Sequence, residues 1–171
     1  MAGLGATSRT LVAGVQRGAR ARTATLDGDA TLVESPQGYR SVAYDGTRGY
    51  RPVVVFWAEQ DLVLHDQFRD GHVPAGCGNV RVLKQAVANL PQGITQLFLR
   101  ADSALYETAV LRWCEARTIG YAISADMSAQ LKTEILHLPE SAWQREREEP
   151  DAVRAWAEVP SASCWRSPES G

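Results

Sequence analysis

The sequence has almost no lysine and no general excess of positive charge. Lys84 and Lys132 are its only lysines, and the formal net charge is −2 at pH 7. Proteins that hold nucleic acid through a broad basic field carry clustered cations that neutralise phosphates, so the overall charge does not indicate that class. The one locally basic stretch, Arg9–Arg22, is either a contact with DNA or a solvated leader.

Long apolar runs and paired metal ligands are also missing. No stretch approaches the length of a membrane span, and the N-terminus has no continuous apolar segment of the signal-peptide type, so we expect a cytoplasmic protein with no membrane partner. The three histidines show no spacing typical of zinc ligands. The three cysteines are odd in number and far apart, which predicts free thiols: Cys77, Cys114 and Cys164.

The chain is long enough for one domain with a real core. It has 171 residues, of which 44% are hydrophobic and 22% charged, ordinary values for a globular chain. We expect a poorly ordered basic leader, an α/β core, a charged helical linker and a disordered tail. Their boundaries are 1–22, 23–138, 139–158 and 159–171.

The most informative stretch is Thr23–Glu34, which predicts a buried strand carrying two acids. With period two, its small and apolar residues fall on one face, while Asp27 and Asp29 fall on the other. Aspartate is unfavourable in strands and costly to bury unless it is paired or binds a cation. The strand therefore either ends at these residues or holds a metal ion.

Four further strands and three helices follow. Asn79 is expected to cap the first helix and Ser128 the last, and Asp102 stands at the end of the fourth strand. The predicted strands are Thr23–Glu34, Tyr50–Ala58, Leu62–Phe68, Thr95–Ala101 and Tyr121–Ala125. A hairpin followed by helical crossovers predicts a mixed sheet of order 3-2-1-4-5 with helices on both faces, the ribonuclease H-like order.

In this topology the first and fourth strands are parallel neighbours, so Asp29 and Asp102 would face each other. Facing carboxylates suit Mg²⁺ or Mn²⁺, and a pair of such ions supports in-line displacement at a phosphodiester. Asp27 competes with Asp29 for the role. We prefer Asp29 because the hydroxyl of Thr31 can support its carboxylate.

Each candidate also has a plainer interpretation. Either aspartate alone fits a strand end or turn, and Asp102 followed by Ser103 is an ordinary start of a helix. Arg69 and Arg100 either contact phosphates or serve as caps and solvated side chains.

Four blocks of sequence resemble the DDE transposases of bacterial insertion sequences with a group 1 transposase DDE domain. They are TLDGDATLVES, GYRPVVVFWAEQDLVLHDQFRDGHVPAG, LFLRADSALYETAVLRWCE and YAISADMS, within Thr23–Glu158. The resemblance implies a magnesium-dependent, ribonuclease H-like domain that cuts DNA at element ends and joins the 3′ hydroxyl to a target. It implies Asp29 as the first acid, within Asp-Ala-Thr, and Asp102 as the second, within RADSALY.

The resemblance also implies a third acid, a glutamate on a later helix, and none of Glu148, Glu149 and Glu158 is assigned that role. We therefore expect a truncated transposase, incomplete at the C-terminus, inactive by itself and associated with the bacterial nucleoid. Its expected partners are insertion-sequence ends, target DNA and a second or full-length transposase chain. Two alternatives stay open: a small metal-dependent nuclease of the same fold, and a non-enzymatic DNA- or partner-binding remnant.

Overall fold

The computed structural model describes residues 12, 14, 21–31, 33–34, 49–70, 72–73, 77–145 and 155–159. The chain divides into two compact units, Met1–Ala125 and Asp126–Gly171, and each is described by itself. None of the helices among the described residues is long and apolar enough to cross a membrane.

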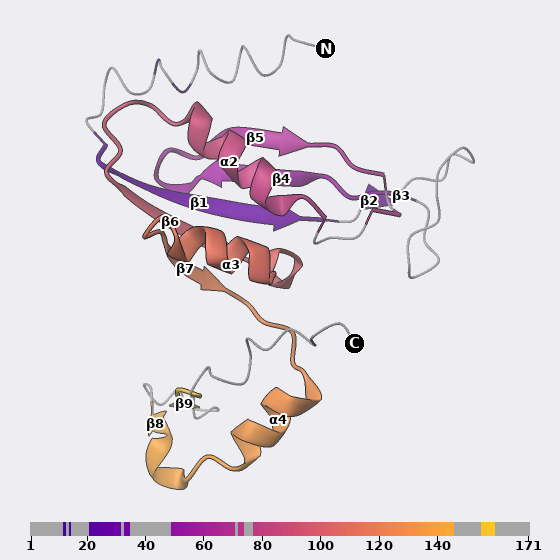
Figure 1. Ribbon diagram of the computed structural model, residues 1–171, viewed down its shortest axis with the longest axis vertical. Coiled ribbons are helices and arrows are strands. Elements are labelled where there is room, and N and C mark those ends of the chain that lie inside the picture. The colour runs from indigo at the N-terminus through magenta and orange to yellow at the C-terminus, as the bar shows by residue number, and fades with distance from the viewer. Residues whose placement is uncertain are drawn as a thin grey trace, which may run out of the picture. The chain divides into compact units, whose positions relative to one another are not determined.

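The first unit is built on a five-stranded mixed sheet (Figure 1). Its order is β5-β4-β1-β6-β7, in which β1 pairs antiparallel with β4 and parallel with β6. This confirms the predicted order 3-2-1-4-5 and the ribonuclease H-like arrangement. The five strands are β1 (Thr23–Ala30), β4 (Val53–Trp57), β5 (Leu62–Gln67), β6 (Gln96–Ala101) and β7 (Gly120–Ile123).

Two very short strands were not predicted as separate elements. The chain that follows β1 forms β2 (Val33–Glu34), which pairs antiparallel with β3 (Gly49–Tyr50) in a sheet of its own. The predicted first strand, Thr23–Glu34, is therefore divided into two strands, and β1 ends just after Asp29.

Buried and accessible residues alternate along β1, so that, among the described residues, one face of the sheet is covered and the other is not. Ala24 and Leu26 are fully buried, whereas Asp27 is half-buried and Asp29 is exposed on the opposite face. The helices α2 (Asn79–Asn89) and α3 (Thr108–Glu115) contribute to the same core cluster as Ala24 and Leu26. Figure 1 shows both helices in front of the sheet.

The fold confirms the predicted mixed five-stranded sheet with helices, and among the described residues of this unit α2 and α3 share one core cluster with the buried residues of β1. The second face of β1 and β6 carries Thr25, Asp27 and Arg100. This face stays accessible, and Phe98 on it is 44% exposed.

The core lies between the covered face and the two helices. Its largest buried side chains include Trp57, Leu83 and Leu99, and burying each contributes roughly 1.5–3 kcal/mol. Val12 belongs to the same cluster and is only 2% exposed. At this residue the predicted leader is anchored in the core, while most of 1–22 lies outside the described residues.

The second unit begins with α4 (Ala129–Leu136), and here the predicted cap is confirmed. The Ser128 hydroxyl accepts a hydrogen bond from the Leu131 amide at 3.0 Å. The predicted helical linker over 139–158 is wrong for the residues described. After the 3-10 turn η3 (Glu140–Ala142), β8 (Gln144–Arg145) pairs antiparallel with β9 (Ala155–Trp156). The predicted tail lies outside the described residues beyond 159.

Candidate metal centre

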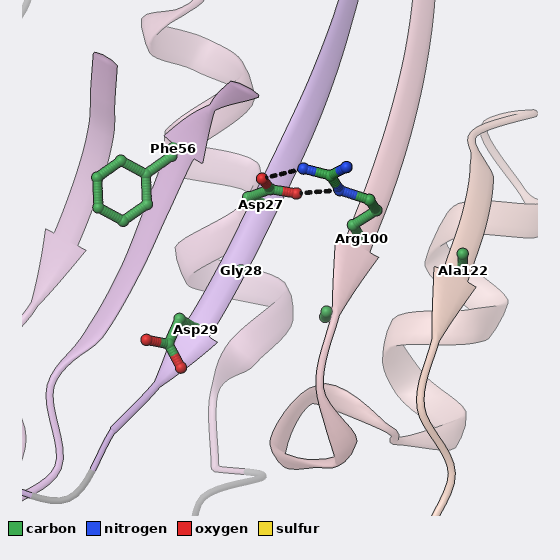
Figure 2. A pocket seen from close by; sticks show the side chains of 7 residues that line it. Asp27, Gly28, Asp29, Phe56, Arg100 and Ala122 are labelled. Carbon is green, nitrogen blue, oxygen red and sulfur yellow. Dashed lines mark hydrogen bonds and ion pairs between the residues drawn. The ribbon is translucent and has the colours of Figure 1, made fainter. Parts of the chain in front are cut away.

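Asp27 and Arg100 form an ion pair across the parallel strands β1 and β6 (Figure 2). The two residues are register partners, and Arg100 Nε donates to Asp27 Oδ1 at 2.6 Å, while Arg100 Nη2 donates to Oδ2. The hydrogen bond to Asp27 and its negative charge raise the pKa of Arg100. Both carboxylate oxygens of Asp27 are thus engaged by a cation of the protein itself.

Asp29 lies two residues further along the same face of β1 and is exposed. Its carboxylate makes a local hydrogen bond, because Thr31 Oγ1 donates to Asp29 Oδ2 at 2.8 Å. The sequence analysis expected this hydrogen bond, and the structure contains it. Asp29 therefore presents a supported carboxylate close to, but separate from, the ion pair, as Figure 2 shows.

Asp102 follows the last residue of β6 and keeps an extended backbone, with φ −81° and ψ −176°. Its Oδ1 accepts a hydrogen bond from the Ala104 amide at 3.1 Å and thereby caps the 3-10 turn η2 (Ser103–Leu105). The capping role that the sequence allowed is present. The hydrogen bond fixes the carboxylate relative to the turn.

The register between β1 and β6 brings the two preferred aspartates to the same level. Their ladder ends with Gly28 opposite Ala101, and Asp29 and Asp102 are the next residues of the two chain segments. Neighbouring strands lie about 4.8 Å apart, and alternation puts both residues on the exposed face with Asp27 and Arg100. The juxtaposition of Asp29 with Asp102 stays a prediction, because the β1–β6 register ends one residue before each of them.

A hollow of about 350 Å³ opens on this face of the sheet. Asp27, Asp29 and Arg100 provide its polar lining, and Asp102 is not among its lining residues. The apolar and small lining residues are Gly28, Phe56, Ala101 and Ala122.

Gly28 lies between the two acids of β1 and faces the core. A Cβ atom built there would lie 2.7 Å from Cδ2 of Leu105, which is fully buried in the turn after Asp102. The absent side chain lets this turn pack directly against β1. Glycine at this position therefore serves close packing behind the site.

Arg69 does not have the role that the sequence suggested. It is 6% exposed, and its Nη1 donates to Asn79 Oδ1 at 2.9 Å while its Nε donates to Gln67 Oε1 at 2.9 Å. Burial lowers the pKa of Arg69. A guanidinium used inside the fold is not available to a DNA phosphate, so Arg69 is withdrawn as a nucleic-acid contact.

Asn79 and Glu107 are the residues that sequence reasoning missed. Asn79 does not cap α2, because Gly78 holds that position with a φ of 76°. Its side chain is buried and donates to the Ala104 carbonyl at 3.0 Å and to Glu107 Oε1. No local sequence pattern predicts these contacts, since the partners of Asn79 lie 25 and 28 residues away along the chain.

The donor set fits a hard divalent cation. Asp29 and Asp102 offer carboxylate oxygens, which Mg²⁺ and Mn²⁺ prefer, and Asp29 is exposed to solvent. Within the described residues, no group of three or more His, Cys, Asp or Glu side chains is arranged to hold a metal ion. Glu148 and Glu149 lie outside the described residues, and Glu158 belongs to the second unit.

The fold is that of a ribonuclease H-like domain, with Asp29 near the end of β1 and Asp102 directly after the adjacent parallel strand β6. The sequence matches the family described as Transposase DDE domain group 1 over residues 6–169, nearly the whole chain. The chain belongs to this family. No curated protein sequence matches it.

Solved structures with a similar fold include a retroviral and a transposon protein. The HTLV-2 integrase catalytic core domain, in complex with magnesium, is 15% identical with a TM-score of 0.41, covering 58% of this chain and 59% of the integrase chain. The catalytic domain of Mos1 mariner transposase is 14% identical with a TM-score of 0.43, covering 77% and 65%. The chain thus spans about three fifths of that integrase chain.

Proposed function

We propose that Asp29 and Asp102 form the divalent-metal half-site of a DDE transposase domain that acts on DNA phosphodiesters. The supporting observation is the parallel β1–β6 register, whose last pair, Gly28 with Ala101, directly precedes Asp29 on one strand and Asp102 on the other. Membership of the DDE family supports the same reaction class, metal-dependent DNA cleavage and strand transfer. The DNA partners would be element ends and a target in the nucleoid.

The residues of the chain have separate tasks in this proposal. Asp29, oriented by Thr31, and Asp102, oriented by the Ala104 amide, hold the cation. Bound Mg²⁺ or Mn²⁺ would supply charge stabilisation for the attacking and leaving oxygens of an in-line displacement. Asp27 stays with Arg100, which leaves Asp29 as the ligand from β1.

Two aspartates do not by themselves complete the three-acid set that the family resemblance implies. We propose that the described half-site binds one divalent ion weakly and does not support strand transfer without a third carboxylate. The Asp126–Gly171 unit and a second transposase chain are two sources that can be tested for this carboxylate.

Binding of Mn²⁺, followed by NMR line broadening of backbone amides, tests the proposal. We expect broadening centred on the ends of β1 and β6, lost in both Asp29→Asn and Asp102→Asn. Asp66→Asn is the matched control, because Asp66 is an exposed acid on the same sheet, two strands away from β1 on β5. Broadening that survives either aspartate variant would overturn the half-site.

Nicking of supercoiled plasmid with Mg²⁺ distinguishes the half-site from a working nuclease. We expect no nicking by the wild type at metal concentrations that produce broadening. Nicking that disappears in Asp102→Ala would show that the chain already has its third ligand. Asp66→Ala again serves as the control for nuclease contamination and for non-specific loss of charge.

A further inference from the structure

The turn that carries Asp102 is held by hydrogen bonds on both sides of one residue, Ala104. On one side, the Ala104 amide donates to Asp102 Oδ1 at 3.1 Å. On the other side, the Ala104 carbonyl accepts from Asn79 Nδ2 at 3.0 Å. The Asn79 side chain is therefore two hydrogen bonds away from the carboxylate assigned to the metal.

The amide of Asn79 has only one favourable orientation. Arg69 Nη1 donates to its oxygen at 2.9 Å, and Glu107 Oε1 accepts from its nitrogen. Turning the amide over would place its NH₂ group against the guanidinium and its oxygen against two acceptors. The donor of Asn79 is thus fixed towards the Ala104 carbonyl.

Burial makes the loss of any hydrogen bond in this network costly. Asn79 is 1% exposed and Arg69 6% exposed, so water does not replace a lost partner cheaply. Asn79 begins α2, Arg69 follows β5, and Glu107 precedes α3. The network therefore connects three elements of the covered face to the turn at the end of β6.

We propose that Asn79 is a positioning residue for Asp102, acting through Ala104. This inference rests on the proposed metal half-site. A ligating carboxylate binds well only if it is held in place, and loss of an outer partner of such a ligand typically weakens metal binding about 10- to 100-fold. Since Asn79 acts through one intervening residue, we expect the lower end of that range.

The test compares two isosteric substitutions at opposite ends of α2. Asn79→Asp keeps the shape but cannot donate to the Ala104 carbonyl. Asn89→Asp is the matched control, because Asn89 Nδ2 donates to the Leu64 carbonyl at 2.8 Å, at the other end of the same helix. We expect the Mn²⁺ Kd to rise about tenfold in Asn79→Asp and to stay within about twofold in Asn89→Asp.

A second measurement needs no metal. Amide hydrogen exchange at Ala104 should become faster in Asn79→Asp than the global loss of stability explains, and should follow global stability in Asn89→Asp. Equal Mn²⁺ affinity and equal Ala104 protection in the two variants would overturn the positioning role. If wild-type protein shows protection at Ala104 but no Mn²⁺ broadening, the metal half-site fails while the hydrogen-bond network stands.

Glu107→Ala covers the case in which Asn79→Asp does not fold. Glu107 lies at the less buried end of the network, and its removal frees one side of the Asn79 amide without adding a charge. We expect a smaller change of the same sign in both Mn²⁺ affinity and Ala104 exchange. A folded Glu107→Ala protein with wild-type values in both measurements would contradict the proposal.

Discussion

Arg100 and Asp27 occupy register positions directly opposite each other on β6 and β1, and Arg100 Nε lies 2.6 Å from Asp27 Oδ1. Asp27 lies two residues before Asp29 on the same face of β1, which corresponds to about 7 Å along the strand. The cation therefore cancels the charge of the first acid and leaves the charge of the second. The ion pair gives a second reason, besides the Thr31 hydroxyl, to prefer Asp29 over Asp27.

Substitutions in this ion pair should change metal affinity in opposite directions. Arg100→Gln releases the Asp27 carboxylate, and Asp27→Asn leaves the Arg100 cation unbalanced near the site. A unit charge about 7 Å from a divalent ion in water alters its affinity about three- to tenfold. We expect tighter Mn²⁺ binding in Arg100→Gln and weaker binding in Asp27→Asn, measured by paramagnetic broadening.

The double variant Asp27→Asn with Arg100→Gln is the control, because it conserves net charge and should restore wild-type affinity. Stability should change little in each single variant, since the pair is exposed and screened by solvent. Complete loss of Mn²⁺ binding in Asp27→Asn that the double variant does not restore would make Asp27 the ligand in place of Asp29.

Gly28→Ala should destabilise the first unit. The new Cβ would lie 2.7 Å from Leu105 Cδ2, and because Leu105 is fully buried, any movement of its side chain must displace other core groups. Overpacking of this kind costs about 1–3 kcal/mol. Urea unfolding of the variant measures the change, and the resonances of the Asp102 turn should shift because Leu105 belongs to it.

Gly120→Ala provides the comparison for this effect. Its Cβ would meet the Phe98 ring at the same distance, 2.7 Å, but Phe98 is 44% exposed and can turn into solvent. The cost at Gly120 should therefore be the smaller of the two. An equal or larger loss of stability at Gly120 would show that the buried Leu105 contact is not limiting.

Glu107→Gln should alter how stability depends on pH. Burial raises the pKa of Glu107 above its ordinary 4.5, although the Asn79 hydrogen bond and the Arg69 charge act in the lowering direction. An acid with a raised folded-state pKa favours folding at low pH, and this contribution is lost as pH rises from the ordinary value through the raised one. Glutamine stays neutral throughout.

The variant should therefore gain stability relative to wild type as pH rises across that window. Urea unfolding of both proteins at several values between about pH 4 and pH 7 measures the difference. Glu107→Asp, which stays titratable, should keep a pH-dependent stability. A difference between Glu107→Gln and wild type that is the same at every pH would rule out the raised pKa.

Thiol labelling should separate the cysteines. Cys77 is exposed, whereas Cys114 is buried in α3 and burial raises its pKa to about 11. Since the thiolate is the reactive form, iodoacetamide at neutral pH should modify Cys77 and leave Cys114 intact. Peptide mapping by mass spectrometry, with urea-unfolded protein as the control, identifies each site and separates Cys164. Rapid modification of Cys114 in folded protein would contradict its placement.

The sheet could be predicted from sequence because its signals are local and repeat. Period-two alternation in Thr23–Ala30 and the β-branched run at Val53–Trp57 specify strands, and short connections limit how the strands can be ordered. The pairing of β8 with β9 could not be predicted, because these strands have no local, repeating sequence pattern. Each has two residues, so the structure there depends on a partner and not on a local pattern.

The candidate site could be predicted only where neighbours along the chain decide the geometry. Thr31 supports Asp29 from two residues away, and this contact was expected. For Arg69 the sequence left open a phosphate contact or a capping or solvated side chain, but Arg69 is buried beside Asn79 and Glu107. Such a network cannot be predicted from local sequence patterns because its members come from separate helices, strands and loops.

The parallel pairing of β1 with β6 also bears on when the site can exist during synthesis. Asp27 and Arg100 are 73 positions apart, and Asp29 has the same separation from Asp102. Contacts this distant require a large loop to close, which makes them late events in folding. A ribosome-bound chain that has completed only the β4–β5 hairpin therefore holds one acid without its neighbour. The proposed half-site would be complete only after β6 has emerged and paired with β1.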